Sequence, residues 1–312
     1  MNEVMDAVES AFKENVLGCV QMPAKPYLYY SEYGGDLRVM PSYIERLNTS
    51  AVKIVNSHPD NPVKYNLPTV MAIITLIDPE KGTPFAIMGG AHITAMRTGA
   101  AGGIATKYLA RKDSRVLGMI GLGVQARTLL MAITRVREID RVYAFDISWE
   151  KSHKFAKKMG KNLGIDVIPV NKLEKAVKPA DILTTATPSR KPIVQNKWVK
   201  EGLHINAIGA DAAGKEELDP AILKRAKIVV DDWEQASHSG EINVPLTEGI
   251  ITRESIWGEI GEIVADLKLG RASPDEITVF DSTGLAIQDA ATAKLAYDKA
   301  LAKNLGQMIE IL

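Results

Sequence analysis

The apolar residues in the first third of the chain fall into short runs separated by turn residues. Glycine pairs, prolines and aspartates interrupt the pattern at residues 34–35, 59–62 and 78–82. Short apolar runs joined in this way are typical of an antiparallel meander. The predicted strands cover residues 27–30, 37–40, 52–55, 70–77 and 84–88. An amphipathic helix is expected at residues 1–12, and a helix rich in small residues over 93–110.

From Ser114 onward, apolar runs alternate with longer segments that suit crossover helices. This alternation predicts an α/β domain with a doubly wound parallel sheet, whose ligand lies at the carboxyl ends of the strands. An alanine-rich helix over residues 285–304 has no strand partner, and we expect it to return to the first domain. The predicted domains are therefore 114–284 and 1–113 with 285–312. The strands are expected at residues 115–120, 142–145, 166–170, 181–185, 203–208, 228–230 and 277–280.

Length, charge and cysteine content narrow the class of protein. A chain of 312 residues exceeds one usual core, which agrees with two domains. Lysine plus arginine and aspartate plus glutamate both number 38, so no net field favours nucleic acid or an anionic membrane. Cys19 is the single cysteine, which excludes an internal disulfide and favours a reducing cytoplasm. The five histidines show no metal-ligand spacing, so we expect no metal.

A glycine motif opens the predicted parallel sheet. An apolar run ends in Gly121-x-Gly123-x-x-Ala126, and a second run ends about twenty residues later on Asp146. The first glycine permits a tight strand-to-helix turn, the second admits a pyrophosphate, and Ala126 keeps the helix close to the sheet. Asp146 can accept the ribose hydroxyls of NAD and would repel the 2′-phosphate of NADP. A glycine turn without a ligand is the alternative interpretation.

Polar residues follow several of the predicted strands. Asp211 comes just after the strand at 203–208, between small residues that leave room for a ligand, and Lys215 follows it. A carboxylate in such a place can act as a general base. Ser189 and Ser282 lie at other strand ends, where capping of the next helix is the ordinary alternative.

Four cations lie in or beside the apolar runs of the first domain, namely Lys25, Arg38, Lys53 and Arg97. A buried cation is costly unless it is paired. A substrate carboxylate is one such partner, and an internal aspartate or glutamate is the alternative. Together, the four cations favour recognition of an α-carboxylate.

These elements together resemble the ornithine cyclodeaminase/μ-crystallin family over nearly the whole chain, and most of all its archaeal-type alanine dehydrogenases. The resemblance rests on residues 53–61 (KIVNSHPDN), 97–100 (RTGA), 121–126, 208–218 (IGADAAGKEEL) and 279–284. It implies NAD(P)-dependent homodimers with a Rossmann domain and a separate α+β substrate and dimerisation domain. It also implies that Lys53 and Arg97 bind the substrate carboxylate, that Asp211 is the catalytic acid/base, and that Lys25 and Arg38 line the same pocket. The chain starts later than is usual in the family, which implies either a missing outer strand or a different natural start.

The expected cofactor contacts combine the glycine motif, the strand ends and this resemblance. They are Thr98, Gly121, Gly123, Val124, Gln125, Ala126, Asp146, Ile147, Ala186, Thr187, Ile208, Gly209, Ala210, Lys215 and Ser282.

Arg38 decides between the substrates that the resemblance allows. Ornithine cyclodeaminases carry a glutamate there to hold the distal ammonium of ornithine, and a guanidinium would repel that ammonium by several kcal/mol. We therefore expect NAD-dependent, reversible oxidative deamination of L-alanine to pyruvate and ammonia. The alternatives are an ornithine cyclodeaminase and a reductase of cyclic imines such as pyrroline-2-carboxylate. A non-enzymatic dinucleotide-binding protein would not require the acid Asp211.

Overall fold

The computed structural model describes residues 1–310, and their contacts divide the chain into two compact units. The first unit contains residues 1–5 and 98–284, and the second contains residues 6–97 and 285–312. The division falls within helix α3 (Gly90–Leu109), whereas the sequence placed the domain boundary at 113/114. Close packing explains the difference, because a Cβ atom at Gly99 would lie 2.5 Å from the backbone of Thr128. The carboxyl-terminal half of α3 therefore packs within the first unit.

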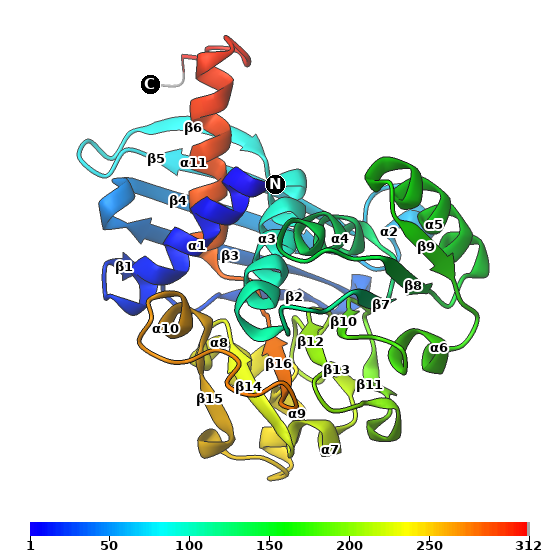
Figure 1. Ribbon diagram of the computed structural model, residues 1–312. Helices are drawn as coiled ribbons and strands as arrows, with labels where there is room; N and C mark the ends of the chain where they lie inside the picture. Colours follow the sequence, from blue (N-terminus) through cyan, green and yellow to red (C-terminus); the bar gives the residue numbers. More distant parts are fainter. Residues whose placement is uncertain (311–312) are drawn as a thin grey trace. The chain divides into compact units, whose positions relative to one another are not determined.

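The first unit is built on an eight-stranded parallel sheet in the order β15-β14-β16-β12-β10-β7-β8-β9 (Figure 1). The chain winds outward from β7 to β9, then crosses back to β10 and continues on the other side. This is the predicted doubly wound topology, with its switch point between β7 and β10. The strands are β7 (Val116–Ile120), β8 (Arg141–Phe145), β9 (Asp166–Pro169), β10 (Ile182–Thr185), β12 (His204–Ala207), β14 (Ala226–Val230), β15 (Ile256–Glu259) and β16 (Ile277–Asp281).

The connections of this unit are mostly helical. A separate parallel pair, β11 (Arg190–Val194) with β13 (Glu216–Leu218), was not expected from the sequence, and neither was β15. The helices are α4 (Val124–Val136), α5 (Trp149–Leu163), α6 (Leu173–Val177), α7 (Pro220–Leu223), α8 (Trp233–Ser239), α9 (Asn243–Thr247) and α10 (Ile260–Val264).

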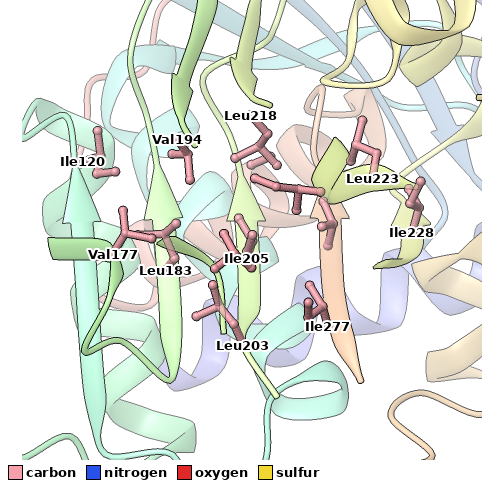
Figure 2. Close-up of a cluster of buried hydrophobic side chains, with 14 of the residues drawn as sticks. Ile120, Val177, Leu183, Val194, Leu203, Ile205, Leu218, Leu223, Ile228 and Ile277 are labelled. Carbon is pink, nitrogen blue, oxygen red and sulfur yellow. The ribbon is translucent and has the colours of Figure 1, made fainter. Parts of the chain in front are cut away.

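The sheet of the first unit is buried by apolar side chains. Figure 2 shows Leu183, Ile205 and Ile277 on adjacent strands, with Val177 and Leu223 from covering segments packed on them. These strands are buried at every position rather than at alternate ones, because a parallel sheet is covered on both faces. The burial fixes the strands, so the loops at their carboxyl ends have a rigid base.

The second unit is a six-stranded antiparallel sheet in the order β1-β3-β4-β5-β6, with β2 paired to β3. Sequential pairing from β3 to β6 confirms the predicted meander. The strands are β1 (Val20–Gln21), β2 (Tyr27–Tyr30), β3 (Gly35–Ile44), β4 (Thr49–Ser57), β5 (Val70–Ile77) and β6 (Pro84–Gly89), and a short helix α2 (Asn61–Lys64) follows β4.

Helix α11 (Ala286–Ala302) packs against β3, β4 and β5 of this sheet. Its first two turns, from Ala286 to Ala293, are buried, and small alanine side chains let it lie close to the strands. The amino-terminal helix α1 (Asn2–Val16) buries Val8 and Phe12, as its predicted apolar face requires. A charged side chain buried between α11 and this sheet must therefore pair with another group of the protein.

Candidate functional site

The carboxyl ends of five neighbouring strands of the first unit lie in one row. The paired residues are Phe145 with Ile120, Ile120 with Thr185, Thr185 with Ala207, and Ala207 with Asp281. The residues that follow them therefore line one edge of the sheet, and they are Asp146, Gly121, Ala186, Ile208 and Ser282. All five were predicted from the sequence as cofactor contacts, and the structure brings them together on the edge where doubly wound sheets bind ligands.

The glycine loop has the geometry of a phosphate site. Gly121 has φ +83°, and a Cβ atom there would lie 2.6 Å from the carbonyl oxygen of Ala186, so only glycine makes this turn. Around Gly123, by contrast, a Cβ atom would meet nothing within 4 Å, so the space in front of α4 is open. Gly123 caps α4 without a side-chain hydrogen bond, which leaves the first N–H groups of the helix to a ligand. Ala126 is fully buried.

Asp146 follows β8 and is held in place by the glycine loop. Its Oδ2 accepts a hydrogen bond from the backbone N–H of Leu122 at 3.1 Å, and its Oδ1 accepts one from Ser148 N–H at 2.9 Å. The next side chain, Ile147, is 97% exposed. A fixed carboxylate beside a glycine loop, with no cation following it, suits two ribose hydroxyls better than a 2′-phosphate.

Asp211 lies in the loop between β12 and β13, where it forms an ion pair with Lys215. The Asp211 side chain is 39% exposed, and Lys215 is 18% exposed. The backbone N–H of Asp211 donates to Gly209 O at 3.1 Å, which forms a tight turn directly after β12. The acid therefore lies at the ligand edge of the sheet, open to a ligand and oriented by a neighbouring cation.

Two buried glutamates lie behind this loop. Glu217 and Glu241 are fully buried, and Glu241 accepts hydrogen bonds from the backbone N–H groups of Glu217 and Leu218. Burial raises the pKa of both carboxyl groups, and the neighbouring charge of Glu217 raises that of Glu241 further. Neither was identified from the sequence, because Glu217 lies in a charged stretch and Glu241 follows a polar turn, and neither context gives a sign of burial.

The second unit contains a buried group of two cations and one acid. Lys53 on β4 forms an ion pair with Asp289 on α11, and Arg97 Nε donates to the other oxygen of Asp289 at 3.2 Å. Arg97 also donates to Gln288 at 2.9 Å. Two cations thus share one carboxylate, so the group carries excess positive charge whenever Lys53 is protonated. Burial lowers the pKa of Lys53 to about 7, although the charge of Asp289 opposes this shift.

Arg38 on β3 lies on the same sheet and has a different partner. Its Nε and one terminal nitrogen contact both oxygens of Asp36 at 2.8 and 3.2 Å, and its guanidinium stacks on the ring of Tyr27. Lys25 is half-buried, and its charge contributes to lowering the pKa of Lys53. The internal acid that the sequence left open as an alternative partner therefore exists for Arg38, Lys53 and Arg97. Asp289 and Gln288 were missed because no spacing links α11 to β4.

Replacing Asp289 with asparagine is expected to lower the free energy of unfolding by about 2 to 4 kcal/mol, because two buried cations lose their shared counter-charge. Urea unfolding at pH 6, where Lys53 is protonated, measures the change. Asp298→Asn is the matched control on the same helix, since the Asp298 pair with Lys294 is largely exposed and contributes at most about 0.5 kcal/mol. Equal effects of the two substitutions would contradict this account of Asp289.

Two buried polar side chains, His204 and Ser282, have hydrogen-bond partners within the protein. His204 is a buried core residue whose ring nitrogens bond to Thr278 and Asn206, and burial lowers its pKa to about 3. Ser282 is buried and donates to Asp231 at 3.4 Å.

Among residues 1–310, no cluster of histidine, cysteine or acidic side chains could hold a metal ion. Over the same residues, no helix combines the length and apolar character that crossing a membrane requires.

Comparison with known proteins gives matches over the full chain. The model of the ornithine cyclodeaminase/mu-crystallin family matches residues 1–304. An alanine dehydrogenase of Archaeoglobus fulgidus is 52% identical over 99% of this chain and 94% of its own length. Among solved structures, an archaeal alanine dehydrogenase dimer with bound NAD superimposes with a TM-score of 0.96 at 52% identity, covering 100% of this chain and 95% of that one.

A second solved structure is nearly as similar. The Δ1-pyrroline-2-carboxylate reductase of Thermococcus litoralis, in complex with NADH and L-proline, has a TM-score of 0.97 at 46% identity. The match covers 99% of this chain and 96% of the reductase. Sequence identity is therefore higher to the amino-acid dehydrogenase, whereas the TM-score is slightly higher to the cyclic-imine reductase.

Proposed function

Because the chain belongs to the ornithine cyclodeaminase/mu-crystallin family, we propose that it is an NAD-dependent alanine dehydrogenase. The reaction is the reversible oxidative deamination of L-alanine to pyruvate and ammonia, with reduction of NAD to NADH. The observation that carries the proposal is the buried group of Lys53, Arg97 and Asp289. Its excess positive charge is complementary to one substrate carboxylate, which would complete the pairing of both cations.

Arg38 favours a substrate with one amino group. Its guanidinium is nearly buried, and Asp36 is held by two hydrogen bonds from it. A distal ammonium, as in ornithine, would meet a guanidinium at this position, and the carboxylate of Asp36 is already taken up by that guanidinium. Alanine has an apolar methyl group instead, so it needs no carboxylate there.

The residues of the first unit fit a bound NAD. The open backbone at Gly123 and the uncapped start of α4 would hold the pyrophosphate, and Asp146 would accept the hydroxyls of the adenosine ribose. When bound, NAD supplies the acceptor for the hydride from the substrate Cα. We assign further contacts with NAD to Thr98 and to the residues that follow three strands. These residues are Ala186 and Thr187 after β10, Ile208, Gly209 and Ala210 after β12, and Ser282 after β16.

The protein's own groups perform the remaining chemistry. Lys53 and Arg97 bind the substrate carboxylate and fix the orientation of Cα. The Asp211 carboxylate removes a proton from the water that adds to the imine carbon, and then returns a proton to the departing ammonia. Lys215 orients Asp211 through their ion pair.

The test of this function is a substrate panel. With NAD, we expect L-alanine to give NADH, pyruvate and ammonia, and L-ornithine to give no proline. The second candidate function is reduction of pyrroline-2-carboxylate, which the similarity to the Thermococcus litoralis reductase favours. Faster turnover of that imine with NADH than of pyruvate plus ammonia would replace our assignment with the reductase.

Exchanging Asp146 for serine is expected to reduce the preference for NAD over NADP about 10-fold or more, since the charge that repels the 2′-phosphate is removed. Measuring kcat/KM with both cofactors gives the preference. The control is Asp140→Ser, because Asp140 is exposed just before β8, at the other end of the strand. An unchanged preference in Asp146→Ser would show that another residue selects the cofactor.

We further propose a cytoplasmic homodimer. The lone cysteine suits a reducing compartment. Ile73 and Ile87, on the paired strands β5 and β6, are 50% and 60% exposed, and a second copy would cover them. Light scattering coupled to size exclusion tests the dimer, and a particle mass near 34.0 kDa would contradict it.

A further inference from the structure

The side chain of Glu217 joins two loops at the ligand edge of the parallel sheet. Its Oε1 accepts hydrogen bonds from both the backbone N–H and the hydroxyl of Thr187, each at 2.7 Å. Its Oε2 accepts one from the backbone N–H of Gly209 at 2.9 Å. Thr187 follows β10 and Gly209 follows β12, so one carboxylate ties together the loops of two adjacent strands.

The two loops are also in direct contact. A Cβ atom at Gly209 would lie 2.2 Å from the carbonyl oxygen of Thr187, so the backbones touch here without any side chain between them. Gly209 in turn accepts the N–H of Asp211 at 3.1 Å. A shift of Gly209 would therefore move Asp211, and the Glu217 carboxylate is the group that holds Gly209 in place.

Glu217 itself lies on a firm support. It belongs to β13, which pairs with β11, and its backbone N–H donates to Glu241 at 2.9 Å. Its side chain is fully buried, where a carboxylate is costly unless its oxygens accept hydrogen bonds. Thr187 and Gly209 donate three such hydrogen bonds to the carboxylate, and we assign both residues to cofactor binding.

We propose that Glu217 is a positioning residue for the reaction: it holds the loops of Thr187 and Gly209, and through Gly209 the acid Asp211, in their working arrangement. This inference rests on the proposed function, because it assumes that these loops bind NAD and that Asp211 handles protons. A role in stability alone is the alternative. If Glu217 only stabilises the fold, its replacement lowers stability but leaves the NAD affinity and the pH profile of the folded protein unchanged. If Glu217 positions the loops, its replacement changes both.

Glu217→Gln is the principal variant. Whichever way the new amide lies, one of its ends is a donor and faces at least one N–H group that loses its acceptor. We expect NAD to bind about 10-fold more weakly, kcat/KM for L-alanine to fall at least 10-fold, and the pH profile of kcat to shift. Glu217→Asp keeps the charge but shortens the reach, so the same changes are expected in smaller measure. It serves as the second variant if Glu217→Gln does not fold.

Asp181→Asn is the matched control. Asp181 accepts backbone hydrogen bonds from Arg115 and Val116 at the opposite end of the same sheet. The Asp181→Asn substitution is expected to lower the melting temperature but to leave the NAD affinity, kcat/KM and the pH profile as in the wild type. If a folded Glu217→Gln or Glu217→Asp behaves like this control, the inference is overturned.

The failure of the proposed function is distinguishable from the failure of this inference. A wild-type protein that binds NAD but does not oxidise L-alanine would contradict the function, while weaker NAD binding by Glu217→Gln would still support the positioning role. A wild-type protein with no affinity for NAD would overturn both.

Discussion

The variant Asp211→Asn is expected to oxidise L-alanine with kcat lowered by roughly 10²- to 10⁴-fold, the range for loss of a general acid/base. The amide can neither remove a proton from the attacking water nor return one to ammonia. Asp211 is well placed for both transfers, because it is partly exposed at the ligand edge and ion-paired with Lys215. The affinity for NAD is expected to stay within about threefold of the wild type, since we assign Asp211 no role in holding the cofactor.

Steady-state NADH formation and equilibrium NAD binding together measure this effect. The control is Asp166→Asn, because Asp166 is an exposed, ion-paired aspartate at the amino-terminal start of β9, away from the ligand edge. It should leave kcat unchanged. A kcat for Asp211→Asn above one-third of the wild-type value would remove Asp211 from the mechanism and assign the proton transfers to another group.

The second large effect is expected for Lys53→Met, which should lower kcat/KM for L-alanine roughly 10- to 100-fold, mainly through KM. Without the ammonium, Asp289 neutralises Arg97 completely, so the excess positive charge that attracts a carboxylate is lost. Methionine fills a similar volume, and the fold should persist. The control Lys227→Met removes a mostly buried strand lysine that pairs with Glu276 in the first unit, and kcat/KM should not change.

The titration of Lys53 gives this prediction a pH dependence. Burial lowers its pKa to about 7, so the ammonium is present below that pH and is lost above it. The affinity for propionate, a carboxylate that does not titrate in this range, should therefore fall as the pH rises from 6 to 9. The fall should be much smaller in Lys53→Met. An equal pH dependence in both proteins would assign the titration to another group.

Much of the fold could be predicted because its elements follow from local pattern. The strand at residues 70–77 has the predicted bounds, and the glycine motif has the predicted turn, because the turn after β7 needs a positive φ and glycine adopts one readily. The parallel order also follows from alternation of strands and helices. By contrast, β13 is a three-residue strand of mainly acidic sequence, and its burial depends on the hydrogen bonds that Glu217 and Glu241 accept.

The cations and the acid of the candidate site were predicted from the sequence, but their ion-pair partners were not. The sequence identified Lys53 and Arg97 as buried cations, yet their shared partner Asp289 is 236 residues from Lys53 along the chain. The alanine-rich helix that carries Asp289 gives only a weak signal, an acid among small residues that are themselves buried. Tertiary packing decides such pairings. The sequence also left open whether Arg38 would face an internal acid, and Asp36, two residues earlier on β3, is that acid.

The central claim is that the substrate Cα–H of L-alanine is transferred as hydride to NAD. Incubation of the protein with L-alanine deuterated at Cα and NAD, followed by mass spectrometry of the products, tests it directly. We predict singly deuterated NADH, pyruvate and ammonia in equal amounts. Undeuterated cofactor, or conversion of ornithine to proline while alanine is left intact, would contradict the account.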